Sequence, residues 1–255
     1  REGGLAALHL AAAMAAIQKQ ACEVVVVGTV QVPEGHSLSE GAAVARQRRQ
    51  EVEQVAEMGA SLGLTVRVKP RVRVGYVPWN ELQPMLRSER PGLTICSWGG
   101  DPHEHILGVP VRRLLAQPPC DLILVPRVPD FTALRRVLLA VRGGRHAPFS
   151  LRVAMALVEA SDGEITLLHS AERGYGPVLS TPYQEFLRLV RHANAVSRHI
   201  TATGDVPLTI VREARYHDLI ILGMSNQQTP DLPLGRVIGE VAARADKPIL
   251  ITCKL

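Results

Sequence analysis

Apolar residues in this chain follow two alternating patterns. Short continuous runs of Val, Ile and Leu are typical of strands covered on both faces, and the longer stretches between them repeat with helical spacing. Strands that alternate with helices in this way indicate right-handed crossovers and a parallel sheet. The second half is therefore predicted to be one complete doubly wound domain, residues 135–255. Its predicted strands are 136–141, 164–170, 195–203, 218–223 and 248–253, and its predicted helices are 147–160, 181–193, 206–215 and 235–245.

The first half, residues 1–128, shows the same alternation but begins at a helix. Its predicted helices are 4–20, 39–62, 77–89 and 109–117, and its predicted strands are 23–30, 64–74, 93–98 and 121–125. The strand equivalent to 136–141 is missing. In a five-stranded doubly wound sheet that strand is central, so its absence would open a slot lined by unpaired backbone groups. We expect residues upstream of Arg1 to supply it, and a first sheet of four contiguous strands would contradict this.

Two segments of the chain repeat each other at a distance of roughly 130 residues. The segment Gly92–Arg127 is echoed by His217–Leu255, and in both a strand, a loop and a Leu-Gly pair precede a helix and a last strand. The pairs are Leu107-Gly108 and Leu234-Gly235, each expected to open its helix. The predicted fold class is therefore α/β, with two tandem doubly wound parallel five-stranded sheets, the first lacking its first strand, joined by a linker at 126–134.

Composition excludes several classes of protein. Of the 255 residues, 46% are hydrophobic and 21% are charged, which is typical of a globular protein rather than a disordered one. No apolar run is long enough to span a bilayer. The net charge of +5 is too small to predict a nucleic acid polymer as a partner. The start at Arg1 rather than Met leads us to expect a piece of a longer protein. Four cysteines lie in or beside apolar strands and are predicted to be buried and reduced: Cys22, Cys96, Cys120 and Cys253.

The strand at 64–74 alternates strictly between apolar and basic residues. Val66, Val68, Val72 and Val74 share one face, whereas Arg67, Lys69, Arg71 and Arg73 share the other, with Pro70 between them. A charged face and a proline are typical of an edge strand that resists further pairing. A basic stripe for phosphate or anionic lipid is the alternative interpretation.

The motifs of the second half resemble those of the universal stress protein family. The resemblance lies in VLLAVRGGRHAPFSLRVAMAL (137–157), EITLLHS (164–170), GDVP (204–207), DLIILG (218–223) and LGRVIGEVAARADKPILIT (234–252); the first half matches through CEVVVVGTV, TICSWGG and PPCDLILVPR. It implies the fold of that family, also called adenine nucleotide alpha hydrolase-like. Single-domain members dimerise through the last strand, and tandem members resemble such a dimer joined in one chain.

The resemblance also implies where a nucleotide would bind. ATP-binding members carry an Asp after the first strand and a Gly-x-x-Gly, about nine residues, Gly-Ser/Thr signature after the fourth. Here Arg142 stands in place of the Asp, Asn226 in place of the second Gly and Arg236 in place of the hydroxyl residue. ATP or another adenine nucleotide therefore remains a candidate ligand, held differently, because arginine pairs well with phosphate. The alternative is that these arginines form surface ion pairs. The candidate site residues are Val141, Arg142, Gly143, His169, Gly223, Ser225, Gly235 and Arg236.

Other chemistry is less well supported by the sequence. Asp101, His103, Glu104 and His105 lie close together, but on a proline-containing loop that favours a solvated polar segment over a metal site. His169 ends a strand and is either a pocket residue or a structural histidine. No nucleophile motif, phosphate loop or pair of carboxylates at strand ends is present, so we expect no enzymatic activity.

Arg142-Gly143-Gly144 after the first strand resembles a transporter-associated subgroup of this family. It implies a non-catalytic regulatory domain on the cytoplasmic face of the cell membrane. Its partners would be the transmembrane transport domain of an amino-acid or cation-chloride transporter and a second copy of the chain in a homodimer. The alternative is a free-standing tandem universal stress protein that binds ATP. A scaffold without any ligand is a third, weaker interpretation.

Overall fold

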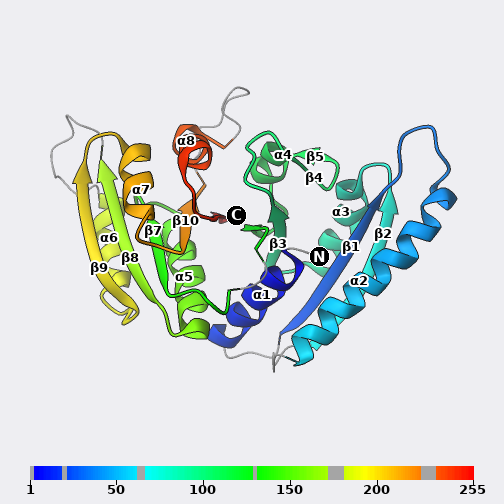
Figure 1. The fold of residues 1–255 in the computed structure, drawn as a ribbon, viewed down its shortest axis with the longest axis horizontal. Helices are drawn as coiled ribbons and strands as arrows, with labels where there is room; N and C mark the ends of the chain where they lie inside the picture. The colour runs from blue at the N-terminus through cyan, green and yellow to red at the C-terminus, as the bar shows by residue number, and fades with distance from the viewer. Residues whose placement is uncertain (1–2, 19–21, 62–66, 129–130, 172–180, 225–233) are drawn as a thin grey trace.

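The second unit has the complete doubly wound sheet that its sequence predicts. The computed structural model describes residues 3–18, 22–61, 67–128, 131–171, 181–224 and 234–255. Five parallel strands follow the order β11-β10-β7-β8-β9, and helices pack on both faces (Figure 1). The elements of this unit are β7 (Arg136–Ala140), α5 (Ala147–Ser161), β8 (Glu164–Ala171), α6 (Thr181–Val190), β9 (Val196–Thr203), α7 (Val206–Ala214), β10 (Leu219–Gly223), α8 (Arg236–Arg244) and β11 (Ile249–Cys253).

The first unit is split where the central strand is missing. Strands β1 and β2 pair with each other in parallel, and β3 pairs in parallel with β6, but within the described residues β1 and β3 do not pair. The predicted interruption of this sheet is confirmed. The elements are α1 (Gly4–Gln18), β1 (Glu23–Gln31), η1 (Leu38–Gly41), α2 (Ala42–Ser61), β2 (Arg67–Gly75), α3 (Pro78–Glu89), β3 (Leu93–Trp98), β4 (His105–Ile106), β5 (Val109–Pro110), α4 (Val111–Ala116) and β6 (Asp121–Pro126).

The two units are joined through their last strands. Strand β6 pairs antiparallel with β11, with Leu124 opposite Ile251, so that seven strands form one sheet in the order β3-β6-β11-β10-β7-β8-β9. At the end of this junction the Lys254 ammonium lies 2.8 Å from the Asp121 carboxylate. This is the arrangement that the resemblance implies for a dimer joined in one chain. The boundaries of the units at residues 128 and 135 stay predictions, because sheet and core both continue across them.

The hydrophobic core has one layer on each face of the joined sheet, and both layers contain residues of both units. One layer packs α1 against α5, with Leu10 of the first unit and Leu151 of the second in the same cluster. The other layer includes Trp98 and Leu114 together with Ile220 and Ile238. Burial of shared apolar surface on both faces couples the two units energetically. No helix among the described residues is long and apolar enough to cross a membrane.

The Leu107-Gly108 pair does not open a helix, contrary to the sequence prediction. Leu107 has φ +56° and Gly108 has φ +79°, and together they form the turn between the short strands β4 and β5. Helix α4 begins only at Val111. The pair in the second unit does behave as predicted, since Gly235 directly precedes α8. Positive φ at two successive residues is typical of a tight hairpin turn and cannot continue into a right-handed helix.

The remaining details of the first unit agree with its sequence pattern. Strand β2 pairs only with β1 in the described part of the chain, as predicted for an edge strand. Its basic face is partly neutralised, because Lys69 pairs with Glu23 and Arg71 with Glu89. The cysteines of both units are free thiols, as predicted; Cys96, Cys120 and Cys253 are buried, whereas Cys22, beside the start of β1, is only partly buried, contrary to the prediction.

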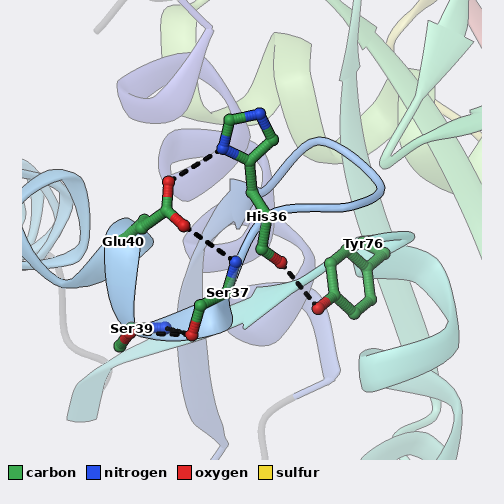
Figure 2. A network of polar contacts seen from close by, with 5 residues as sticks. All are labelled: His36, Ser37, Ser39, Glu40 and Tyr76. Atoms are coloured by element: carbon green, nitrogen blue, oxygen red, sulfur yellow. Dashed lines mark hydrogen bonds and ion pairs between the residues drawn. The ribbon is translucent and has the colours of Figure 1, made fainter.

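The loop that follows β1 is fixed by its own polar network, which Figure 2 shows. Ser37 caps the short helix η1, and its backbone N–H donates to Glu40 Oε1 at 2.9 Å. The other oxygen of Glu40 lies 2.8 Å from His36 Nδ1. The Tyr76 hydroxyl, just beyond β2, donates to the His36 carbonyl at 2.8 Å. The loop is therefore held against the end of β2, which keeps the carboxyl ends of β1 and β2 together.

Candidate functional site

The carboxyl ends of the central strands of the second unit lie at one edge of the sheet, which is where doubly wound folds bind ligands. Val141 follows β7, and its backbone N–H donates to the Leu168 carbonyl at 3.0 Å. His169 of β8 lies beside it, with Nδ1–H donating to the Val141 carbonyl at 3.0 Å. The structure thus brings Val141 and His169 together, as expected for strands that are neighbours in the sheet.

Tyr183, at the start of α6, covers this part of the edge. Its ring stacks on the imidazole of His169 with centroids 3.7 Å apart, and its hydroxyl is hydrogen-bonded to His199 Nε2 at 2.6 Å. The start of α6 can lie this close to the loop after β7 because residue 143 is a glycine. Gly143 has φ +92°, and a Cβ at this position would lie 2.7 Å from the Tyr183 backbone nitrogen. Tyr183 was not predicted from the sequence; the signal available was an aromatic residue in the first turn of an amphipathic helix.

Burial decides the protonation states of this cluster. Desolvation lowers the pKa of His169 below its ordinary value of 6.5, and the nearby His199 lowers it further against the opposing effect of the Val141 hydrogen bond. Desolvation also raises the pKa of Tyr183. Both rings are therefore neutral at pH 7. The neighbouring Ser170 hydroxyl is buried and has no hydrogen-bond partner within the described part of the chain.

We expect the stability of the chain to fall below pH 6.5 through His169. Folding lowers the pKa of His169, so the unfolded chain binds a proton at this imidazole more readily than the folded chain does. The contribution of the neutral imidazole to the free energy of unfolding is fully present above the pKa of His169 in the unfolded chain. It is lost as the pH falls through the pKa of His169 in the folded chain. Urea unfolding at about pH 7.5 and about pH 5 measures the loss. His169→Asn retains an N–H for the Val141 carbonyl but does not titrate, so its loss over the same interval should be smaller. An equal loss in both proteins would contradict the assignment.

A second group of candidate residues lies at the start of α8. Gly223 ends β10, and the backbone N–H of Met224 donates to the Thr252 carbonyl at 2.8 Å. Gly235, with φ +76°, is the N-cap of α8 and, as a glycine, offers no capping side chain of its own. The first N–H groups of α8 therefore keep a partial positive charge. Ser225 lies outside the described residues.

Arg236 lines a hollow beside this helix end. The hollow has a volume of about 610 Å³ and lies between α8 and the loop that leads from β9 into α7. Arg236 also pairs with Glu240, one turn along the helix, at 3.4 Å. The other lining residues are Thr203, Gly204, Asp205, Leu208, Thr209 and Arg212. Arg212, rather than Arg142, therefore shares the hollow with Arg236.

Charges in the hollow are predominantly positive. The carboxylate of Asp205 caps α7 by accepting the Leu208 N–H at 2.8 Å, and the Thr209 hydroxyl donates to the Asp205 carbonyl at 2.8 Å. The Asp205 carboxylate is therefore hydrogen-bonded at the start of α7, and the dipole of that helix offsets part of the carboxylate charge. The two guanidinium groups and the positive, amino-terminal end of α8 are the groups suited to an anionic ligand.

In the first unit, the loop with Gly99 and Gly100 that follows β3 is its glycine loop, and this loop already holds a carboxylate. The Gly99 N–H donates to Glu104 Oε2 at 2.6 Å, and the other oxygen of Glu104 pairs with Arg127. Glu104 thus occupies the backbone donor that a phosphate would need. Asp101 accepts the His103 N–H at 2.8 Å, and within the described residues no group of three or more His, Cys, Asp or Glu is arranged to hold a metal ion. Glu104 was predicted to lie in a solvated loop, and this role was not predicted.

No protein-family model matches the sequence, and no curated protein matches it. Among solved structures, a universal stress protein from Archaeoglobus fulgidus is 18% identical with a TM-score of 0.66, covering 97% of this chain and 91% of that chain. A functionally unknown protein from Pseudomonas aeruginosa is 13% identical with a TM-score of 0.51, covering 94% of this chain and 95% of that chain. These likenesses extend over both units and show the fold, which is that of the universal stress proteins.

Proposed function

We propose that this chain is a non-catalytic ligand-sensing module whose second unit binds a phosphate-bearing adenine nucleotide. The observation that carries the proposal is the start of α8, where the N-cap is a glycine, Gly235, beside a hollow that contains Arg212 and Arg236. A helix start attracts anions through its dipole and its first N–H groups, and two guanidinium groups add charge-assisted hydrogen bonds. Phosphate groups would lie in this hollow.

The adenine part of the proposal rests on the fold. A universal stress protein is among the solved structures that this chain is similar to, and the sequence resemblance implies ATP or another adenine nucleotide. The usual acidic residue and hydroxyl residue are replaced by Arg142 and Arg236, so phosphate contacts would be made by arginine instead. Tyr183 covers His169, so the base would lie on the Leu208 side of the hollow rather than over the imidazole.

The wider setting of this module stays a prediction. A regulatory domain of a transporter, on the cytoplasmic face of the membrane and in contact with the transport domain, is implied by the resemblance of Arg142-Gly143-Gly144 alone. A free-standing tandem universal stress protein is the alternative, and it would use the same hollow. A homodimer is also still a prediction. In either setting, the proposed response to ligand is a shift between arrangements of the units rather than chemistry.

Calorimetric titration with ATP, AMP and cyclic di-AMP tests the nucleotide proposal. Binding to the native chain must also raise its melting temperature. We expect Arg236→Ala to weaken the binding of the best of these ligands by about 10- to 100-fold, because a charge-assisted hydrogen bond to phosphate is lost. Arg212→Ala should weaken binding in the same direction.

Arg244→Ala is the matched control for this titration. Arg244 also pairs with Glu240 and belongs to α8, but it lies in the last turn of the helix and does not line the hollow. Its substitution should leave the affinity within about twofold, since it removes only a surface ion pair. Absence of saturable binding of all three nucleotides, or equal weakening by Arg236→Ala and Arg244→Ala, would contradict the proposed site.

A further inference from the structure

The first unit contains an apolar slot with the edge of a strand on either side. The slot has a volume of about 760 Å³, and its lining includes Val24–Val27 of β1 and Leu93–Ser97 of β3. Side chains of α1 and α3 close its faces, among them Leu8, Met14 and Leu82. Since β1 pairs only with β2 and β3 only with β6 in the described residues, backbone N–H and C=O groups on the facing edges of β1 and β3 are directed into the slot.

The second unit shows what burial these strands have when the sheet is complete. There β8 and β10, the equivalents of β1 and β3, lie on either side of β7, and Ile165, Leu167, Leu219 and Ile221 are each 0% exposed. In the first unit the equivalent residues Val24–Val27 and Leu93–Ile95 are only partly buried. In the described residues, the strands on either side of β7 are therefore fully buried, whereas the equivalent strands β1 and β3, which have no strand between them, are only half covered.

We propose that the slot is the seat of one extended apolar strand that runs parallel to β1 and β3 and is delivered from the amino-terminal side of Gly3. The direction follows from the position of Gly3, which lies against Ser97 near the carboxyl end of β3 and donates its N–H to the Val128 carbonyl at 3.3 Å. His146 occupies the equivalent position ahead of α5, against Gly223 at the carboxyl end of β10. Polypeptide that enters α1 at Gly3 therefore comes from the carboxyl end of the slot.

The chemistry of the occupant can be inferred from β7. Its residues Val137, Leu138 and Leu139 are 0% exposed, and it pairs in parallel with both neighbours. A segment with at least three consecutive large aliphatic residues fits the slot, because both of its faces would be covered. Right-handed crossover from such a strand through α1 to β1 is the connection that β7, α5 and β8 make in the second unit. The slot is separate from the hollow at Arg236, so this inference does not depend on the proposed nucleotide site.

The chain's own β7 provides the probe. A copy of residues 136–146, which contains β7 and its connection to α5, is fused directly ahead of Gly4 in place of residues 1–3. We expect the melting temperature to rise by roughly 5–10 °C through burial of the three aliphatic side chains. Amide exchange in β1 and β3 should slow by at least about tenfold. A second fusion, with the copied Leu138→Asp and Leu139→Asp, has the same length but cannot be buried.

Each outcome of this comparison decides the proposal. Higher melting temperature and slower exchange in β1 and β3 for the apolar fusion alone support it. Equal behaviour of the two fusions, or a lower melting temperature for the apolar fusion than for the unfused chain, would overturn it. The free peptide Arg136–Ala140 is added to the unfused chain as a third arm. If the free peptide, at a concentration equal to that of the chain, slows exchange in β1 and β3 as much as the fusion does, attachment ahead of Gly4 adds nothing and the proposed delivery through Gly3 is contradicted.

Discussion

Gly143→Ala is expected to lower the free energy of unfolding by about 2–5 kcal/mol, combining backbone strain with overpacking against α6. Gly143 has φ +92°, a backbone conformation that residues other than glycine rarely adopt. The Cβ of the new alanine would also lie within 2.9 Å of the Pro182 carbonyl carbon and the Tyr183 backbone. Backbone atoms cannot move aside as the end of a side chain can. The first turn of α6 must therefore shift, and the stack of Tyr183 on His169 would be lost with it.

Gly144→Ala is the control for this substitution. Gly144 has a similar φ of +86°, but a Cβ at this position meets nothing within 4 Å. The two variants share the cost of a positive φ and the same change in the unfolded chain, so their difference isolates the clash with α6. Urea unfolding monitored by circular dichroism measures both. Equal losses for the two glycines would mean that α6 does not pack against Gly143 in solution.

The second unit could be predicted from sequence because its elements are long and regular. Runs such as 218–223 and 248–253 are continuous, β-branched and bounded by helices, which leaves few alternatives to a buried parallel strand. The repeat then supplied a template for the first unit, so that even a missing strand could be predicted from the order of the others. Absence of that strand interrupts the sheet between β1 and β3, because the order of the elements along the chain places the missing strand between them.

Features that depend on tertiary packing could not be predicted in this way. Strands β4 and β5 have two residues each, too few for any periodicity. The cover formed by Tyr183 and the insertion of Glu104 into the glycine loop depend on where a helix start and a loop settle relative to the sheet. Arg212 was missed because α7 and α8 are neighbours in space but their sequences carry no shared motif.

Leu124→Ala, at the junction of the two units, is expected to lower the free energy of unfolding by about 2–5 kcal/mol, because it leaves a cavity in a fully buried layer. Leu124 is 0% exposed and lies opposite Ile251 across the β6–β11 pair. The same change at Leu189, which is 49% exposed, should alter stability by no more than about 0.5 kcal/mol. Urea unfolding curves of the two variants and the parent chain make the comparison.

Coupling between the units can be measured at the same position. Trp79 and Trp98, the two tryptophans of the chain, both belong to the first unit and are buried, so their fluorescence reports on the packing around that unit. Ile251→Ala changes the second unit, yet it should shift the fluorescence midpoint together with the circular dichroism midpoint, since β6 and β11 share one sheet and one core. The double variant with Leu124→Ala should show a coupling energy of about 0.5–3 kcal/mol. Additive effects with separate midpoints would mean that the two units fold independently and that their last strands do not pair in solution.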